Sequence, residues 1–383
     1  MPKPRTNNSE LPTTQLRVAI VCDWLTGTGG AERVVLELHR MFPEAPIYTS
    51  QYDSRGKLWQ GDDWFKNADV RTLWLQKLPK SFKKFLPVLR ARAFSRLDLS
   101  QYDLVISSSG AEAKAVKTGP NTVHVCYCHA PTHYYWSRYE EYMQRPGFGI
   151  FNPLARLCLK LLVGPMRRAD YRAAQGPDYL IANSIHTMSQ IKRYYRRDST
   201  VVHPPVDVER FALAPKQKTN RHGFLVVGRQ TPYKRIDLAV AACSKLDLPL
   251  KVIGDGPDHQ KLVKMAGPRV NFLTGISDKE LPWHFQQAQA FIFPAVDDFG
   301  IVAVEALAAG TPVIAYKAGG ALDYVKEGKT GMFFEEQSVD CLSDTLDKFR
   351  PDRIKKSDST QAASQFSPNV FAENIRKFIA SKT

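Results

Sequence analysis

Cysteine is scarce in this 383-residue sequence, and the few cysteines form no pattern. There are six, and the only close pair, Cys126 and Cys128, lies within an apolar run. A structural zinc site would need a second such pair at ligand spacing. The sequence therefore predicts no metal site and no disulfide framework, and it favours reduced thiols in a cytoplasmic protein.

Long apolar runs are also missing. No stretch approaches the roughly 18 apolar residues that a transmembrane helix needs. Residues 1–15 are polar and lack the hydrophobic segment of a secretory signal, so we expect a polar N-terminal tail. These two absences predict a protein that is soluble or peripheral to a membrane.

Acidic residues are outnumbered, 38 against 53 basic ones, which leaves a formal charge of +15. Such an excess predicts an anionic partner, which could be nucleotide phosphates, acidic lipid or nucleic acid. No helix-turn-helix, RNP-like or zinc-finger pattern accompanies the charge. A basic nucleic-acid-binding protein is therefore the alternative with less support, and no specific nucleic acid is expected.

What the sequence does contain is a regular alternation of short apolar runs with helix-length segments, which is typical of a parallel α/β sheet. Strands are predicted at 16–22, 45–49, 104–107, 122–128 and 179–183, and again at 223–228, 250–254, 270–273, 290–293 and 312–316. The length and the restart of the pattern predict two doubly wound, Rossmann-like domains. We expect a first domain over 16–205, a hinge after the paired prolines, a second domain over 206–366, and a C-terminal helix over 367–383 that packs back on the first domain.

A glycine turn with Gly29 and Gly30 separates the first predicted strand from a helix. Backbone amides of such a turn, together with the helix dipole, suit a phosphate group. An ordinary tight turn explains the glycines equally well. The turn is not a G-x-G-x-x-G motif, because no glycine stands at the third glycine position of that motif.

Two cations, Arg229 and Lys234, follow the first strand of the second domain. Loops at the carboxyl ends of parallel strands bind ligands in such sheets, so both side chains could hold a diphosphate leaving group. The alternative is a solvated basic loop. Their position directly after a buried strand favours the functional interpretation.

The most informative stretch is 294–310, where a strand ends in an acidic pair and a glycine before a helix begins. Glu305 is the one carboxylate on this otherwise apolar helix. A buried acid needs hydrogen-bond donors, and ribose hydroxyls are suitable ones. The alternative is a glutamate that is stabilised by the helix dipole.

His129 follows the predicted strand 122–128 directly. A lone histidine is more often structural than catalytic, but the end of a strand is a position from which it could reach a ligand. His133 is a weaker candidate.

Two basic stretches, 71–96 and 151–172, interleave arginine and lysine with leucine and aromatic residues. This composition is typical of an amphipathic surface for anionic headgroups. Core-facing helices with solvated basic backs would explain both stretches without any lipid.

Taken together, these motifs resemble the family-4 retaining glycosyltransferases of GT-B fold, and especially bacterial mannosyltransferases of lipopolysaccharide and phospholipid-glycan assembly. The resemblance covers nearly the whole chain. Its most specific part is the E-x7-E motif, which appears here as Asp297 and Glu305 with aspartate in place of the usual first glutamate.

The resemblance implies a role for each matching residue. It implies that Glu305 holds the ribose hydroxyls, that Arg229 and Lys234 stabilise the diphosphate, and that His129 lies beside the transferred sugar. Catalytic roles are thus expected for His129, Arg229, Lys234 and Asp297. Donor binding is expected of Gly29, Gly30, Arg229, Lys234, Leu273, Gly275, Asp297, Phe299, Gly300, Ile301, Val302 and Glu305.

The resemblance also implies the reaction. We expect a retaining glycosyltransferase that needs no metal or other cofactor and uses a nucleotide sugar, GDP-mannose first and a UDP-sugar as the alternative. The acceptor is expected to be a lipid-linked or membrane-surface glycan of cell-envelope polysaccharide synthesis. The expected place is the cytoplasm, peripheral at the cytoplasmic face of the inner membrane. Another GT-B enzyme with a soluble acceptor is the alternative within enzymes.

Overall fold

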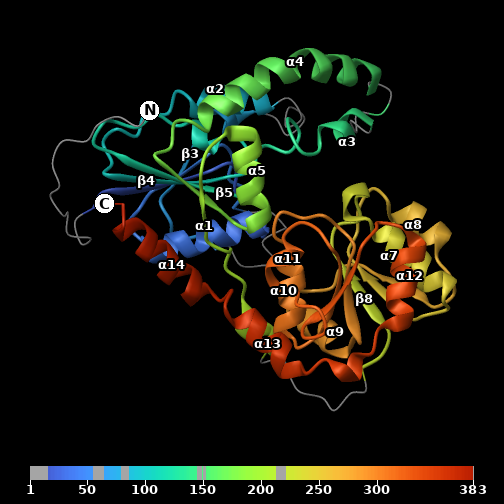
Figure 1. Cartoon of the computed structure of the whole chain (residues 1–383). Helices are drawn as coiled ribbons and strands as arrows, with labels where there is room; N and C mark the ends of the chain where they lie inside the picture. The colour runs from blue at the N-terminus through green and yellow to red at the C-terminus, as the bar shows by residue number, and fades with distance from the viewer. Residues whose placement is uncertain are drawn as a thin grey trace. The chain divides into compact units, whose positions relative to one another are not determined.

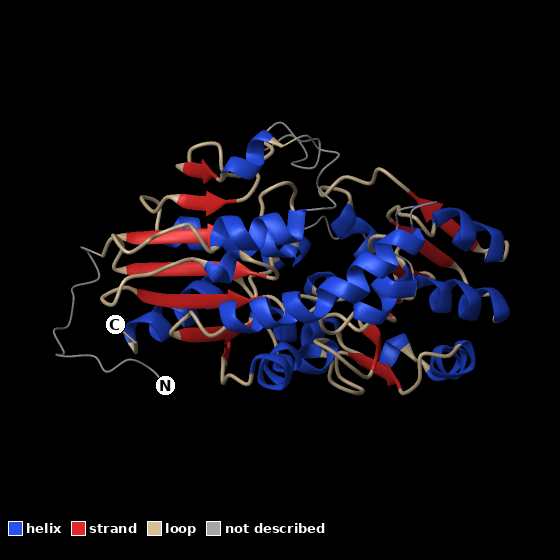
Figure 2. Ribbon diagram, turned by 90° about the horizontal axis from the view of Figure 1, so that it is seen from above, coloured by secondary structure: helices blue, strands red, loops and turns tan. Residues whose placement is uncertain are grey.

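The structure is a computed structural model that describes residues 16–54, 64–78, 86–144, 149, 152–212 and 221–382. Two compact units make up the chain. Unit 1 comprises residues 1–203 and 372–383, and unit 2 comprises residues 204–371. Each unit is an α/β sandwich around one parallel sheet (Figures 1 and 2).

Unit 1 is built on a seven-stranded sheet with the order β3-β2-β1-β4-β5-β6-β7. All of its neighbouring strands run parallel. The strands are β1 (Val18–Cys22), β2 (Ile47–Thr49), β3 (Val70–Thr72), β4 (Leu104–Ser109), β5 (Val123–Cys128), β6 (Tyr179–Ala182) and β7 (Thr200–Val201). The central strands β1, β4 and β5 are buried along their whole length.

Helices connect these strands, as a parallel sheet requires. They are α1 (Gly30–Met41), α2 (Leu86–Phe94), α3 (Tyr139–Gln144), α4 (Asn152–Ala173) and α5 (Ile185–Tyr195), with a 3-10 turn η4 (Ala113–Ala115) after β4. The last helix of the chain, α14 (Pro368–Ala380), brings Phe378 edge-to-face against Tyr179 of β6, with ring centroids 6.1 Å apart.

Unit 2 repeats the arrangement with six strands in the order β10-β9-β8-β11-β12-β13, again all parallel. Its strands are β8 (Phe224–Val227), β9 (Leu250–Ile253), β10 (Val270–Leu273), β11 (Ala290–Phe293), β12 (Val313–Tyr316) and β13 (Gly331–Phe334). Its helices are α6 (Val208–Ala212), α7 (Ile236–Lys245), α8 (His259–Met265), α9 (Leu281–Gln287), α10 (Ile301–Ala308), α11 (Ala321–Tyr324), α12 (Val339–Lys348) and α13 (Lys356–Ser364).

Both faces of the second sheet are buried, which explains why its strands are continuous apolar runs. Successive residues of β11 point to opposite faces. Phe291 and Phe293 belong to the core under α10, whereas Ala290 and Ile292 belong to the core under α7 and α12. The sheet is therefore rigid where the loops after β8 and β11 leave it.

The predicted α/β architecture with two Rossmann-like sheets is confirmed. Every predicted strand is present, but β3, β7 and β13 were not predicted. Among the described helices, none combines the length and the apolar content needed to cross a bilayer.

Candidate active site

The loop that leaves β8 carries the two predicted cations of unit 2. Lys234 ends a 3-10 turn, η6 (Pro232–Lys234), and its Nζ donates a hydrogen bond to Oδ2 of Asp297. The Asp297 side chain is 9% exposed and that of Lys234 is 21% exposed, so this ion pair is only partly solvated. Arg229 is exposed in the same loop. The structure thus joins two of the predicted site residues that are 63 positions apart in the chain.

The turn between Asp297 and α10 depends on a glycine. Gly300 has a φ of +88°, and a Cβ there would lie 2.6 Å from the Phe293 ring and 2.7 Å from the Tyr324 hydroxyl. No side chain caps the helix that follows, so in this part of the described chain the first-turn amides of Ile301 and Val302 are left for another acceptor. Such an amide cluster suits an anionic oxygen.

Phe299 lies in this turn, but its ring belongs to the core. The ring packs against Tyr324 and Phe366 with centroid distances of 5.4 Å, and only 3% of the residue is exposed. The Phe299 carbonyl accepts a hydrogen bond from the Tyr324 hydroxyl. If this residue contacts the sugar donor, the contact would therefore come from its backbone and not from its aromatic ring.

Glu305 lies one turn into α10 and is 5% exposed. Its Oε1 is 3.6 Å from Nη2 of Arg210, which comes from α6. The same guanidinium lies 3.4 Å from Asp278, in the loop after β10. Sequence reasoning did not select Arg210, although the only basic residue in the short α6 was a signal that could have found it.

Leu273 and Gly275 mark the exit of β10. Leu273 packs on the core under α10, and Gly275 has a φ of +71° with open space where a Cβ would be. The strand ends of β8, β10 and β11 thus present their loops at one edge of the sheet, because all three run parallel.

In unit 1 the glycine turn is closed by a carboxylate. Gly29 precedes α1, which begins at Gly30, and a Cβ on Gly29 would lie 2.6 Å from Oε2 of Glu32. Burial raises the pKa of Glu32 to about 7, against the effect of the backbone amides of Glu32 and Gly29, while the nearby Asp23 adds to the increase. The predicted phosphate position at this helix therefore already faces an acid.

His129 follows β5 as predicted, and its ring is fixed by neighbouring strands. Nε2 is 2.7 Å from the Ser108 hydroxyl, and the ring meets Tyr127 edge-to-face at 5.2 Å. The His129 carbonyl accepts a hydrogen bond from the Asn183 side chain.

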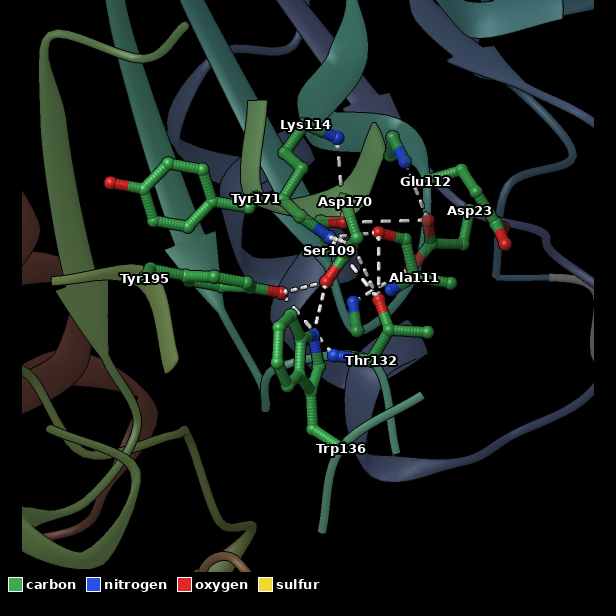
Figure 3. A network of polar contacts seen from close by, with 12 residues as sticks. Asp23, Ser109, Ala111, Glu112, Lys114, Thr132, Trp136, Asp170, Tyr171 and Tyr195 are labelled. Atoms are coloured by element: carbon green, nitrogen blue, oxygen red, sulfur yellow. Dashed lines mark hydrogen bonds and ion pairs between the residues drawn. The ribbon is translucent and has the colours of Figure 1, made fainter. Parts of the chain in front are cut away.

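A buried polar network that was not predicted holds the loops after β1, β4 and β5 together (Figure 3). Asp23, directly after β1, accepts the backbone amides of Gly110, Ala111 and Ala113 at 2.7 to 3.0 Å. Its position immediately after an apolar strand was the available signal. These bonds fix the β4 loop against the start of the glycine turn.

The second half of the network is an ion pair between Lys114 and Asp170, 2.7 Å apart and almost fully buried. Burial lowers the pKa of Lys114, but Asp170 and other neighbouring groups together hold it well above its ordinary value. Asp170 also accepts hydrogen bonds from Thr132, Trp136 and Tyr195. It thus fixes the segment that follows His129 to α4 and α5.

The basic stretch 71–96 turns several leucines to the core where it is described but leaves Trp74 and Val88 half exposed, and residues 79–85 lie outside the described residues. Leu73, Leu78 and Leu89 pack against buried Leu75 and Ala93. Arg90 is buried and its Nε donates to Glu112 at 2.8 Å. In the described ranges, His, Cys, Asp and Glu side chains nowhere gather in threes as metal ligands would.

Two family models match the chain in succession. Residues 28–210 match the description "Glycosyltransferase Family 4", and residues 207–366 match "Glycosyl transferases group 1". Among curated relatives, a GDP-mannose-dependent alpha-(1-6)-phosphatidylinositol monomannoside mannosyltransferase of Mycolicibacterium smegmatis is 31% identical over 206 residues, 46% of this chain and 54% of the relative. A D-inositol 3-phosphate glycosyltransferase of the same organism is 29% identical over 245 residues, 57% of this chain and 55% of the relative.

The matched stretches therefore span little more than half of these relatives. Solved structures match over nearly the whole chain. Anabaena HepE in complex with UDP has a TM-score of 0.67 at 17% identity and covers 95% of this chain and 100% of its own. Sucrose-phosphate synthase from Thermosynechococcus elongatus has a TM-score of 0.69 at 16% identity and covers 95% of this chain and 98% of its own. At these identities the likeness shows a shared fold.

Proposed function

The chain belongs to the glycosyltransferases of GT-B fold, with a family 4 domain followed by a group 1 domain, and on this basis we propose that it transfers a hexose from a nucleotide sugar to a glycan acceptor. Residues 206–366 would form the donor domain and residues 16–205 the acceptor domain. The observation that carries the proposal is the strand-end cluster of unit 2, in which Lys234, Asp297, the uncapped start of α10 and Glu305 lie on adjoining elements.

The cluster has the parts that departure of a nucleoside diphosphate needs. Lys234 and Arg229 would take up the charge that develops on the diphosphate, which is a role that fixed donors perform well in a partly dry site. The amides of Ile301 and Val302 would add to this, and Glu305 would accept from the ribose hydroxyls. Leu273 and Gly275 would face the base. Asp297, together with the backbone of Phe299 and Gly300, would face the donor sugar.

Unit 1 would contribute His129 beside the transferred sugar and Gly29 with Gly30 at the donor phosphate. The acceptor hydroxyl would attack from the face of departure, so that the anomeric configuration is retained. Two cations at the diphosphate support turnover without a divalent ion. We therefore expect full activity in the presence of a chelator.

We propose GDP-mannose as the donor, since the mannosyltransferase relative is described as GDP-mannose-dependent. The description of the same relative names a phosphatidylinositol mannoside, which supports a lipid-linked acceptor of envelope polysaccharide synthesis at the cytoplasmic face of the inner membrane. The alternative donor is a UDP-sugar, because the structural neighbour HepE was solved with UDP.

Thermal shift against nucleoside diphosphates tests the proposal, since a ligand that binds only the folded protein raises its Tm. We expect GDP to raise the Tm most, and GDP-mannose to be turned over. Equal responses to GDP, UDP and ADP, or none to any of them, would remove the donor assignment.

Lys234→Ala provides the matching variant. Loss of one charged donor at a leaving group lowers kcat by about 100-fold or more. Lys245→Ala, which removes an exposed lysine paired with Asp340, serves as the control and should keep full activity. Turnover of Lys234→Ala within a few-fold of the control would contradict the proposed role.

A further inference from the structure

Helix α4 presents an apolar face to solvent. Leu154, Leu157, Leu161 and Leu162 are 59%, 53%, 67% and 45% exposed. Asp170 is the only buried residue among the 22 of this helix. Leucines this exposed are unusual on a single helix of a globular unit, and a contiguous apolar surface of this kind marks an interaction site.

The contacts of α4 show that this face points away from unit 1. Arg156 donates to the carbonyls of Met143 and Gln144, and Arg167 donates to the Tyr135 carbonyl at 2.6 Å. With Asp170 these residues define the inner side of the helix. Leu161 lies about two and a half turns before Asp170, which places it on the opposite, outer side. Figure 1 shows α4 running along the outside of unit 1.

The charge of the helix selects the partner. Exposed Lys160, Arg168 and Arg172 accompany the leucines, and Asp170, which is buried in its ion pair, is the only acid in the helix. A second copy would bring an equally basic helix against this one, which like charges oppose. Basic side chains beside an apolar face are typical of a helix that lies in the headgroup layer of an anionic bilayer.

We propose that α4 is an interfacial membrane helix, with its leucine face inserted among the lipids and its lysine and arginines on anionic headgroups. The inference deepens the proposed function, because it names the surface that would bring the enzyme to a lipid-linked acceptor. It does not depend on that function, since α4 would bind lipid without any donor or acceptor.

The direct test uses Cys158, an exposed free cysteine on the same side of α4. In a Cys341→Ser background, Cys158 is labelled with an environment-sensitive fluorophore. The labelled protein is then mixed with phosphatidylcholine vesicles that either contain or lack phosphatidylglycerol. We expect a blue shift and protection from an aqueous quencher on the anionic vesicles only. An unchanged spectrum would overturn the proposal.

Variants of the unlabelled full chain separate the two contributions in a vesicle flotation assay. Leu157→Gln with Leu161→Gln, and Lys160→Glu with Arg168→Glu, should each weaken partitioning about tenfold or more. The controls are Leu322→Gln, an equally exposed leucine of unit 2, and Lys261→Glu with Lys264→Glu on α8, which makes the same change in net charge.

Two results would overturn the assignment. Equal losses for the α8 and α4 charge variants would show that net charge alone drives binding. A dimer of the wild-type chain that the leucine variant converts to monomer would show that a second copy covers the face. Absence of nucleotide binding, by contrast, would remove the proposed function and leave the membrane helix standing.

A second inference rests on Arg210, whose guanidinium lies between carboxylates of different elements. Glu305 is on α10, Asp278 is in the loop after β10, and Asp207, at 3.9 Å, precedes α6. Within the described residues, Nε and Nη2 of Arg210 are buried and have no hydrogen-bond partner. The ring of Phe211, which is fully buried, supports the guanidinium at 4.6 Å.

We infer that Arg210 is a positioning residue for nucleoside binding. Its charge holds the buried Glu305 carboxylate in place. It also holds the loop that runs from Gly275 to Asp278 close to Glu305. This rests on the proposed function, in which Glu305 accepts from the ribose. The diphosphate would be held by Lys234 and Arg229, and not by Arg210.

Calorimetric titrations of Arg210→Ala with GDP and with inorganic pyrophosphate test the inference. We expect about tenfold weaker GDP binding, an unchanged affinity for pyrophosphate, and partial rescue by Arg210→Lys. In a Glu305→Ala background, Arg210→Ala should have no further effect on GDP. Arg269→Ala, from an exposed pair with Asp247, is the control.

Equal weakening of GDP and pyrophosphate would show a general loss of structure, and unchanged GDP binding would show that Arg210 does not act on the site. Either result overturns the inference. The proposed function would still stand in that case, provided that the wild-type chain binds GDP. Absence of GDP and UDP binding by the wild-type chain would overturn both.

Discussion

Glu32 illustrates how one buried side chain couples stability to pH. The unfolded chain ionises this acid near its ordinary pKa of 4.5, whereas the folded chain does so near 7. The folded state therefore binds more protons between these values, and its stability falls as pH rises through that window. Ionised Glu32 costs up to about 3 kcal/mol, which corresponds to the difference between the two pKa values at about 1.4 kcal/mol per unit.

We therefore expect Glu32→Gln to stabilise the protein at about pH 8 and to leave it nearly unchanged at about pH 4. Urea unfolding at the two pH values measures the difference. Glu44→Gln, at an exposed position of the loop after α1, is the control and should be neutral at both. A pH dependence of Glu32→Gln as steep as that of the wild type would contradict the assignment.

At the scale of single residues, the sequence predicts candidate site residues better than it predicts which residues they contact. Lys234 and Asp297 were both predicted, but only the fold brings a loop after β8 to a loop after β11. Asp23 and Arg210 were not predicted, since their roles arise from backbone amides and carboxylates that are distant in the chain. The core position of the Phe299 ring was not predictable either, because its partner Phe366 comes from the distant segment after α13.

At the scale of elements, the ion pair between Lys114 and Asp170 joins η4 to α4. Asp170 also links α4 to the loop after β5 through Thr132 and to α5 through Tyr195. Asp170→Asn would leave a buried ammonium without its counter-charge. Breaking a buried pair in this way costs about 3–5 kcal/mol. We expect unit 1 to unfold at a correspondingly lower urea concentration.

The matched control is Asp198→Asn, which removes an equivalent carboxylate from an exposed pair with Lys192 and should leave unfolding nearly unchanged. Adding Lys114→Met to Asp170→Asn should recover part of the loss, because the unpaired charge is then gone. No recovery would show that the hydrogen bonds of Asp170, and not its charge, account for the effect.

Strands that are buried on both faces were predictable, whereas three of the four edge strands were not. β11 matches the predicted 290–293 because it is an uninterrupted apolar run. The edge strand β10 matches the predicted 270–273 because Asn271 is its only polar residue. β3 has an arginine at its centre and is largely exposed, β7 has two residues, and β13 begins with glycine. Edge strands of this kind carry little periodic signal, because a single neighbour and not burial holds them.

At the scale of the whole molecule, the chain returns at its C-terminus to the unit in which it began. Residues 372–383 belong to unit 1, although residues 204–371 form unit 2. Ile375, Phe378 and Ile379 repeat at helical spacing along α14 and are all buried. Integrity of unit 1 should therefore depend on the last residues of the chain.

Phe378→Ala tests this dependence, because it removes the ring that meets Tyr179 of β6. Deletion of a buried aromatic side chain costs about 3 kcal/mol or more, so we expect unit 1 to unfold at lower urea concentration. Unit 2 contains the proposed diphosphate and ribose contacts, and its calorimetric affinity for GDP should persist where unit 1 is still folded. Arg376→Ala, on the exposed side of α14, is the control. Because the two units have separate cores, a single variant that destabilised both to the same extent would show that they fold as one cooperative body and not as two.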